Sequence, residues 1–294
     1  MESFAFPPPL SPGDRVHVVA PSSPFPRAEF LRGLGWVRDR YEVAARTSLL
    51  DRSAYLAGSD DGRARALGEA MVDPRAKAIV VARGGYGAMR IVDRLPWDVF
   101  ARAPKWIVGF SDVTALHVEA MARGIASAHG PNVTGLAATD PWTRACYLRA
   151  LERPRAVVEW CNLQLIQPGK AEGSLVGGNL SLVCAMAAAG RWRAPEGAIL
   201  ALEDVTERPY RIDRMLTSLR LGGHLARVGG IVFGDFAQCD PGLDGVTAAD
   251  VLAECTRDLG IPIVAGAPFG HGARNDAFTL GARACIEGDR VVVG

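Results

Sequence analysis

KWIVGFSDVTALH, residues 105–117, places a serine between a short apolar run and a helix-like segment. The apolar residues 106–108 predict the end of a buried strand, and residues 112–116 predict the start of a helix. A strand, a sharp turn carrying Ser111 and a helix are typical of a nucleophile elbow, whose N–H groups can face a developing negative charge. Val113 replaces the second glycine of the usual G-x-S-x-G motif. A serine or aspartate that only caps a helix gives the same short pattern, so both interpretations stay open here.

Strand and helix signals alternate around this stretch in the first half of the sequence. β-rich runs at 16–20 and 78–82 each end in loop residues, and helical spacing of apolar residues occurs at 29–41 and 59–71. This alternation predicts a mostly parallel sheet flanked by helices. Ligands of such sheets gather at the carboxyl ends of the strands, where Ser111 is expected to lie.

The second half of the sequence has shorter strand signals and more glycine and turn residues. It predicts a smaller β-rich, barrel-like domain with a few helices. The predicted fold class is therefore α/β with two domains. We expect an α/β domain with the candidate nucleophile at 1–140, a linker region at 141–168 and the β-rich domain at 169–294.

Composition excludes several classes of protein. The 294 residues are 49% hydrophobic, enough for a substantial core, and the net charge of +1 gives no electrostatic footprint for nucleic acid or an anionic membrane. No apolar run approaches the ~18 residues of a membrane-spanning helix, and the N-terminus lacks the pattern of a secretory signal. Six scattered cysteines without C-x-x-C spacing argue against a metal or disulfide framework and favour a reducing cytoplasm.

A glycine-rich turn, RGGYG at 83–87, follows the predicted strand at 78–82, and a helix is expected at 88–95. A strand, a glycine turn and a helix can bind phosphate, although this spacing matches neither the Rossmann fingerprint nor a P-loop. Glycine is also required where a tight turn needs positive φ. A third possibility is that the bare N–H groups of the turn approach a substrate oxyanion. The residues alone leave these three interpretations open.

A nucleophilic serine needs a base, and the base needs an orienting group. His271 lies between two glycines after an apolar strand, and His129 lies at a predicted strand end, so both are candidates for a functional site. His117 lies six residues after Ser111 on one helix, which would direct it to the opposite side.

Two adjacent acids are candidates for the orienting group. Glu203 and Asp204 follow directly from a buried strand, where an unpartnered carboxylate is costly. Either acid could hold a histidine. Alternatively, either could form a salt bridge with Arg211 or Arg214 of the following helix.

Several motifs occur along the chain in a distinctive order. They are RGGYG (83–87), GFSDVTALH (109–117), HGP (129–131), GGNLSL (177–182), LED (202–204), PYRIDRML (209–216) and PFGHG (268–272). This series resembles the LD-carboxypeptidases, the serine peptidase family that includes muramoyltetrapeptide carboxypeptidase and the microcin C immunity peptidases. The similarity extends over nearly the whole chain, from residue 16 to about residue 284.

The resemblance implies an α/β N-terminal domain with the nucleophile and a β-rich C-terminal domain with the other two catalytic residues. It implies Ser111 as nucleophile, His271 as general base and Glu203 as the residue that holds His271. The oxyanion hole would consist of the backbone N–H groups of Gly85 and Asp112, and the active site would lie between the domains. Homodimers and a cytoplasmic location are common in the family.

The expected reaction is hydrolysis of the amide bond between an L-centre, such as meso-diaminopimelate, and the C-terminal D-amino acid of a murein tetrapeptide. The reaction would proceed through an acyl-enzyme and would need no metal or cofactor. Its expected role is in peptidoglycan recycling. Arg83 is a candidate for binding the peptide carboxylate, and His129 is a second substrate-binding candidate. The alternatives are a microcin-C-type immunity peptidase that cleaves aminoacyl-nucleotide analogues, and a non-catalytic protein that binds small molecules.

Overall fold

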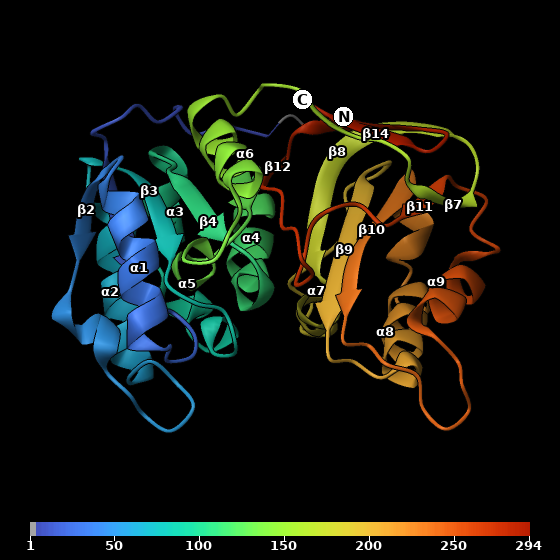
Figure 1. Cartoon of the computed structure of the whole chain (residues 1–294), viewed down its shortest axis with the longest axis horizontal. Helices are drawn as coiled ribbons and strands as arrows, with labels where there is room; N and C mark the ends of the chain where they lie inside the picture. The colour runs from blue at the N-terminus through green and yellow to red at the C-terminus, as the bar shows by residue number, and fades with distance from the viewer. Residues whose placement is uncertain (1–3) are drawn as a thin grey trace. The chain divides into compact units, whose positions relative to one another are not determined.

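The computed structural model describes residues 4–294 and divides them into two compact units (Figure 1). The first unit comprises residues 4–156 and 276–279, and the second comprises residues 157–275 and 280–294. The region expected to be a linker, 141–168, contains helix α6 (Pro141–Glu152), which belongs to the first unit. It also contains strands β6 (Val158–Trp160) and β7 (Gln164–Gln167), which belong to the second. The chain therefore passes between the units at 156–157, and again at 275–276 and 279–280.

The first unit is built on a six-stranded sheet. Its strands are β1 (Arg15–Val19), β2 (Glu42–Ala45), β3 (Ala76–Val81), β4 (Trp106–Gly109), β5 (Ser127–His129) and β12 (Phe278–Leu280). They are ordered β12-β5-β4-β3-β1-β2, and β1 to β5 are mutually parallel. Residues 78–81 of β3 are apolar and fully buried, as expected of a parallel strand covered on both faces. The predicted parallel sheet is confirmed.

Helices cover this sheet on both faces. They are α1 (Arg27–Arg38), α2 (Asp60–Val72), α3 (Trp97–Arg102), α4 (Thr114–Met121), α5 (Val133–Leu136) and α6. From β1 the chain moves toward one edge of the sheet to reach β2, and from β2 through β3 and β4 to β5 it moves toward the other edge. Because these crossovers are right-handed, α1 lies on one face of the sheet and α2, α3 and α4 lie on the other. Helix α5 shares the face of α1, since a Cβ added at Gly33 would lie 1.8 Å from the carbonyl oxygen of Val133.

The prediction of a helix at 88–95 is wrong. The segment forms two short 3-10 turns, η2 (Ala88–Arg90) and η3 (Val92–Arg94), and Pro96 then precedes α3. A residue before proline is disfavoured in the α region, and Leu95 adopts an extended conformation with ψ 145°. The glycine turn at 83–87 is therefore not followed by an α-helix.

The second unit contains an eight-stranded sheet and three helices. The further strands are β8 (Lys170–Asn179), β9 (Ile199–Val205), β10 (Gly230–Ala237), β11 (Ile263–Ala265), β13 (Arg283–Glu287) and β14 (Arg290–Val293), in the order β6-β14-β13-β8-β9-β10-β11-β7. The helices are α7 (Leu180–Ala188), α8 (Pro209–Leu221) and α9 (Ala248–Thr256).

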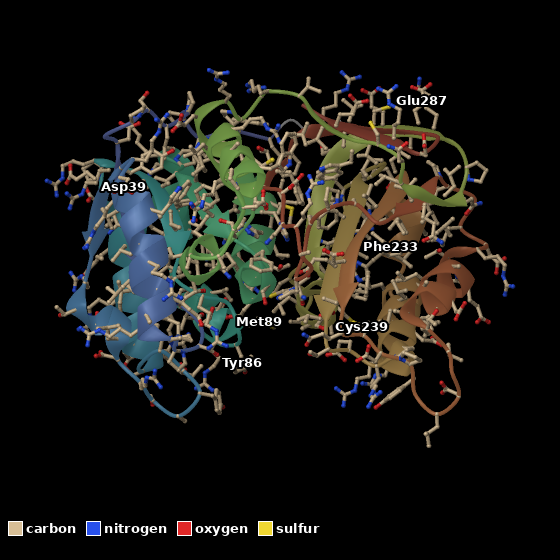
Figure 2. All side chains as sticks on the ribbon, in the orientation of Figure 1. Asp39, Tyr86, Met89, Phe233, Cys239 and Glu287 are labelled. Carbon is tan, nitrogen blue, oxygen red and sulfur yellow. The ribbon has the colours of Figure 1, made fainter. Side chains whose placement is uncertain are left out.

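Strand β8 joins two differently built parts of this sheet. Residues 170–174 pair antiparallel with β13, whereas residues 175–179 pair parallel with β9. Strands β9, β10 and β11 continue the parallel part, whose apolar core includes the fully buried Phe233, labelled in Figure 2. The two sheets confirm the predicted α/β class, with a curled, half-barrel-like sheet in the β-rich unit. Among residues 4–294, none of the helices combines the length and apolar character that crossing a bilayer requires.

The end of β4 is fixed by a buried histidine. His117 of α4 is fully buried, and its Nε2 donates a hydrogen bond to the carbonyl oxygen of Gly109 at 2.9 Å. Burial lowers the pKa of His117 to about 4, so the imidazole is neutral at physiological pH. This supports the expectation that His117 is directed away from Ser111 and is not its base.

Acid should destabilise the fold through His117. The unfolded imidazole takes up its proton near pH 6.5 and the folded one only near pH 4, so the stability from this group is present above pH 6.5 and is lost as the pH falls. Between pH 6.5 and 4.5 we expect wild type to lose about 2 kcal/mol more unfolding free energy than His117→Gln, whose side chain does not titrate. Urea unfolding at both pH values measures this difference. Equal losses in the two proteins would contradict it.

Candidate active site

Ser111 lies at the predicted elbow between strand and helix. Strand β4 ends at Gly109, and Ser111 begins the 3-10 turn η4 (Ser111–Val113), which continues into α4. The φ angle of Ser111 is +66°, a left-handed conformation that residues other than glycine rarely adopt. Such strain costs about 1–3 kcal/mol and clusters at functional sites. The strand, the strained serine and the helix match the geometry of a nucleophile elbow.

The alternative that Ser111 or Asp112 caps the helix is not supported. Neither η4 nor α4 has a side-chain hydrogen bond at its N-cap in the described chain. The Asp112 carboxylate instead accepts a hydrogen bond from the backbone N–H of Ala88, at 2.8 Å. Asp112 therefore connects the elbow to the glycine turn.

The glycine turn lies directly against Ser111. A Cβ added at Gly84 would lie 2.9 Å from the Ser111 Cβ and 3.1 Å from its Oγ. Gly85 has φ +102°, and a Cβ there would lie 2.5 Å from the Oγ of Ser23. Within residues 4–294, neither the Gly85 nor the Asp112 backbone N–H has a hydrogen-bond acceptor. Two N–H groups near the serine are thus available to an oxyanion, whereas no α-helix follows the turn to bind phosphate.

The two substrate-binding candidates of the first unit have different surroundings. The exposed Arg83 guanidinium donates a hydrogen bond to the carbonyl oxygen of Pro24. His129 is fully buried, its ring stacked on Phe278 with centroids 4.8 Å apart and in edge contact with Phe110 at 5.8 Å. His129 therefore packs beside the residue that precedes Ser111. Contact of either side chain with substrate stays a prediction.

In the second unit, the structure pairs Glu203 with His271. Glu203 at the end of β9 is fully buried, and its Oε2 lies 2.7 Å from the Nδ1 of His271. Asn179 donates to the other carboxylate oxygen at 3.3 Å. Burial raises the pKa of Glu203, while His271 and Asn179 act in the opposite direction. An Nδ1–H that donates to the carboxylate leaves Nε2 as the proton acceptor, the tautomer that a general base requires.

The neighbouring acid has a different role. Asp204 accepts hydrogen bonds from the Ser181 hydroxyl at 2.6 Å and the Ser181 N–H at 2.9 Å, and from Asn179 at 3.0 Å. Arg211, considered as an alternative partner of these acids, forms an ion pair with Glu207 at 3.6 Å. The structure thus distinguishes Glu203 from Asp204, which the residues alone did not.

Asp235 lies beside the His271 loop and was not predicted from the sequence. This residue lies in β10 between Phe233 and Phe236, where the register with β9 shifts. A Cβ added at Gly272 would lie 2.1 Å from the Asp235 Oδ2, so the glycine after His271 allows the carboxylate to approach the loop. Burial raises the pKa of Asp235, and the Gly272 N–H and the charge of His271 act in the opposite direction. The only signal in the sequence is an acid at the end of an apolar strand.

Both halves of the chain are similar to known proteins. The family profile of the LD-carboxypeptidase N-terminal domain matches residues 16–130, and that of the LD-carboxypeptidase C-terminal domain matches residues 172–286. A putative carboxypeptidase of Synechocystis sp. is 40% identical over 98% of this chain and 96% of its own length. The murein tetrapeptide carboxypeptidase of Pseudomonas aeruginosa is 32% identical over 82% of each chain.

Solved structures show the same fold. The crystal structure of muramoyltetrapeptide carboxypeptidase from Oxalobacter formigenes is 28% identical, with a TM-score of 0.86 over 95% of this chain and 98% of that one. The microcin C7 self-immunity protein MccF, in complex with glutamyl sulfamoyl guanosine, is 20% identical, with a TM-score of 0.88 over 100% and 98% of the chains, a likeness of fold alone. Because both family profiles match in order and cover most of the sequence, the chain belongs to the LD-carboxypeptidase family of serine peptidases.

Proposed function

We propose that this protein is a serine-type LD-carboxypeptidase that releases the C-terminal D-amino acid of a murein tetrapeptide. The observation that carries the proposal is the strained Ser111, held against a glycine turn with two available N–H groups, in a chain that also pairs Glu203 with His271. The relatives named for murein tetrapeptide carboxypeptidase activity support the substrate class.

The reaction proceeds in two halves. His271 Nε2 takes the proton of Ser111 as Oγ attacks the carbonyl carbon of the L-centre, and Glu203 stabilises the resulting imidazolium. The N–H groups of Gly85 and Asp112 bind the tetrahedral oxyanion. The C–N bond breaks, the imidazolium protonates the leaving amine and the D-amino acid departs. Water, activated by His271, then attacks the acyl-enzyme and restores the Ser111 hydroxyl.

The substrate carboxylate needs a cationic or N–H-rich partner, and we assign Arg83 as the candidate. Its guanidinium already donates to Pro24, and its exposed remaining donors are available to a carboxylate in bidentate geometry. The family resemblance further supports a cytoplasmic homodimer that acts in peptidoglycan recycling. Sedimentation equilibrium of the purified chain measures the dimer directly.

Release of free D-alanine from L-Ala-γ-D-Glu-meso-diaminopimelate-D-Ala tests the function. Wild type is expected to release D-alanine and Ser111→Ala is not, while Ser218→Ala, which alters an exposed serine of α8, serves as the matched control. No release by wild type, with fluorophosphonate labelling of Ser111 intact, would favour aminoacyl-nucleotide substrates of the microcin type. Peptide binding without any labelling of Ser111 would favour a non-catalytic binding protein. Equal release by wild type and Ser111→Ala would disprove Ser111 as nucleophile.

A further inference from the structure

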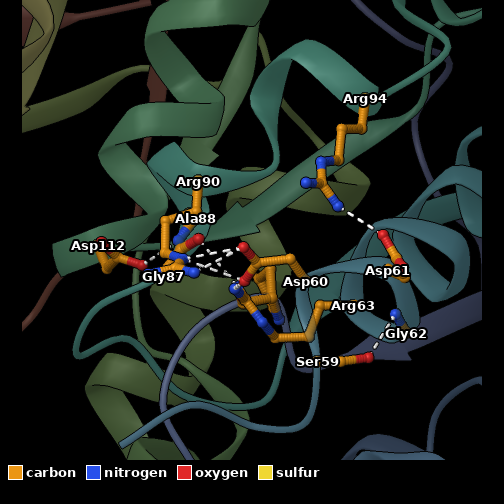
Figure 3. A network of polar contacts seen from close by, with 11 residues as sticks. Ser59, Asp60, Asp61, Gly62, Arg63, Gly87, Ala88, Arg90, Arg94 and Asp112 are labelled. Atoms are coloured by element: carbon orange, nitrogen blue, oxygen red, sulfur yellow. Dashed lines mark hydrogen bonds and ion pairs between the residues drawn. The ribbon is translucent and has the colours of Figure 1, made fainter.

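Asp112 carries a buried carboxylate for which the proposed reaction has no use. The residue is 1% exposed, and its Oδ2 accepts the Ala88 N–H at 2.8 Å (Figure 3). Burial raises the pKa of this carboxyl, while the Ala88 N–H and the charge of Arg63 act in the opposite direction. A buried carboxylate is costly unless its partners compensate for lost hydration, so its position next to Ser111 calls for a function.

Arg63 holds the same turn from its other side. This residue of α2 is 2% exposed, and its Nη1 donates to the carbonyl oxygens of Gly87, at 2.9 Å, and Pro21. Its Nη2 pairs with Asp60, which also binds the guanidinium of Arg90 through bonds of 2.8–3.1 Å (Figure 3). The turn is thus bonded through an N–H to Asp112 and through a carbonyl to Arg63.

Ser23 holds the first half of the glycine turn: its N–H donates to the Gly84 carbonyl oxygen at 3.3 Å, and its Oγ accepts the Tyr86 N–H at 3.1 Å. The second half, at Gly87 and Ala88, depends on Arg63 and Asp112. Gly85 and Gly87 both have positive φ, and glycine readily samples other conformations. The segment that follows consists of 3-10 turns, which have poorer hydrogen-bond geometry than an α-helix. An oxyanion hole works only if its donors are held within about 0.5 Å of the productive position.

We propose that the Asp112 carboxylate is a positioning residue that ties the glycine turn to the elbow and so fixes the distance between the two oxyanion donors. Its backbone N–H is one donor. Its side chain bonds Ala88, three residues after the other donor, Gly85. Arg63 supplies the opposing bond. This inference rests on the proposed reaction, because it assigns a role within that oxyanion hole.

Steady-state kinetics of two substitutions at position 112 test the proposal. Asp112→Ala leaves the Ala88 N–H without its acceptor, so kcat should fall about 10- to 100-fold with KM changed less than about 3-fold. Asp112→Asn keeps an acceptor oxygen and should retain kcat within about 5-fold of wild type. Glu119→Gln is the matched control, since Glu119 of α4 is an equally buried acid that pairs with Arg123 at 2.8 Å. Unchanged kcat in folded Asp112→Ala overturns the proposal.

Fluorophosphonate labelling of Ser111 separates this proposal from the choice of substrate. The phosphoryl oxygen occupies the oxyanion hole during labelling, whatever peptide the enzyme cleaves. If wild type releases no D-alanine but is labelled, the proposed substrate is wrong. In that case, labelling of Asp112→Ala at least 10-fold more slowly than wild type still supports the positioning role. Equal labelling rates overturn it. Failure of wild type to be labelled at Ser111 overturns both proposals.

Arg63→Lys keeps the test decisive if Asp112→Ala does not fold. Lysine retains the charge but lacks the planar fork through which Nη1 bonds the carbonyl oxygens while Nη2 pairs with Asp60, so it loosens the same turn from the other side. A fall in kcat of about 5-fold or more, with KM unchanged, supports the proposal. Unchanged kcat and unchanged labelling in this variant overturn it.

Discussion

His271→Ala is expected to lower kcat/KM for the tetrapeptide by about 10⁴-fold or more, because Ser111 loses the group that accepts its proton. Glu203→Gln should cost about 10²- to 10⁴-fold. The glutamine amide can still accept from the His271 Nδ1, but it carries no charge to stabilise the imidazolium. Release of D-alanine under steady-state conditions measures both losses.

Asp204→Asn is the matched control for Glu203→Gln. Asp204 lies next to Glu203 in β9 and is also buried, but its carboxylate bonds Ser181 and Asn179. We expect its substitution to change kcat/KM by less than about tenfold, since Asp204 bonds Asn179 and Ser181, and Asn179 in turn bonds Glu203. Losses of equal size at the two positions would show that His271 is not oriented by Glu203 specifically, and would contradict the assignment.

The pH dependence of stability separates a catalytic from a structural role for Glu203. Because burial raises the pKa of this group above its usual value near 4.5, its contribution to stability is present below that pH and is lost as the pH rises through the folded pKa. The difference in unfolding temperature, Glu203→Gln minus wild type, should therefore be larger at pH 7.5 than at pH 4.5. A variant that gains relative stability while it loses activity shows that the buried carboxylate is kept for catalysis.

The sequence predicted the parallel part of the fold well, for a physical reason. Runs such as 78–82 are apolar without interruption, because strands covered on both faces bury every side chain. A helix was predicted at 88–95 from composition, and that prediction was wrong. Pro96 disfavours the α conformation before it, and Arg63 and Asp112 bond Gly87 and Ala88. The linker region 141–168 was expected from a change in sequence texture, which does not reveal that helix α6 packs in one unit and β6 and β7 in the other.

The candidate site was predictable only in part. The motif around Ser111 and the glycines at 84–85 carry local backbone requirements that a sequence can display. The choice between Glu203 and Asp204 depends on which carboxylate the 271 loop meets, which is a tertiary contact. Asp235 becomes visible only where a register shift in β10 and the missing side chain of Gly272 bring it to that loop.

Gly85→Ala is the second substitution with a large expected effect, and it tests the oxyanion hole from the turn side. A Cβ at this position would lie 2.5 Å from the Ser23 Oγ, and φ +102° is a conformation that alanine avoids. Relief of either conflict moves the Gly85 N–H, so kcat should fall about 10²- to 10³-fold, the usual cost of one oxyanion donor. KM should change much less, because the donor acts chiefly in the transition state.

Gly124→Ala controls for the backbone cost alone. Gly124 also has positive φ, +66°, but a Cβ there would have nothing within 4 Å. Both variants should lose stability, by about 1 kcal/mol at position 124 and more at position 85, where the added Cβ also meets Ser23. Only Gly85→Ala should lose activity. Adding Ser23→Gly to Gly85→Ala removes the steric conflict but not the φ strain. If this double variant regains kcat, the loss in Gly85→Ala arose because Ser23 displaced the Gly85 N–H. Full activity in folded Gly85→Ala would instead mean that the oxyanion is bound elsewhere.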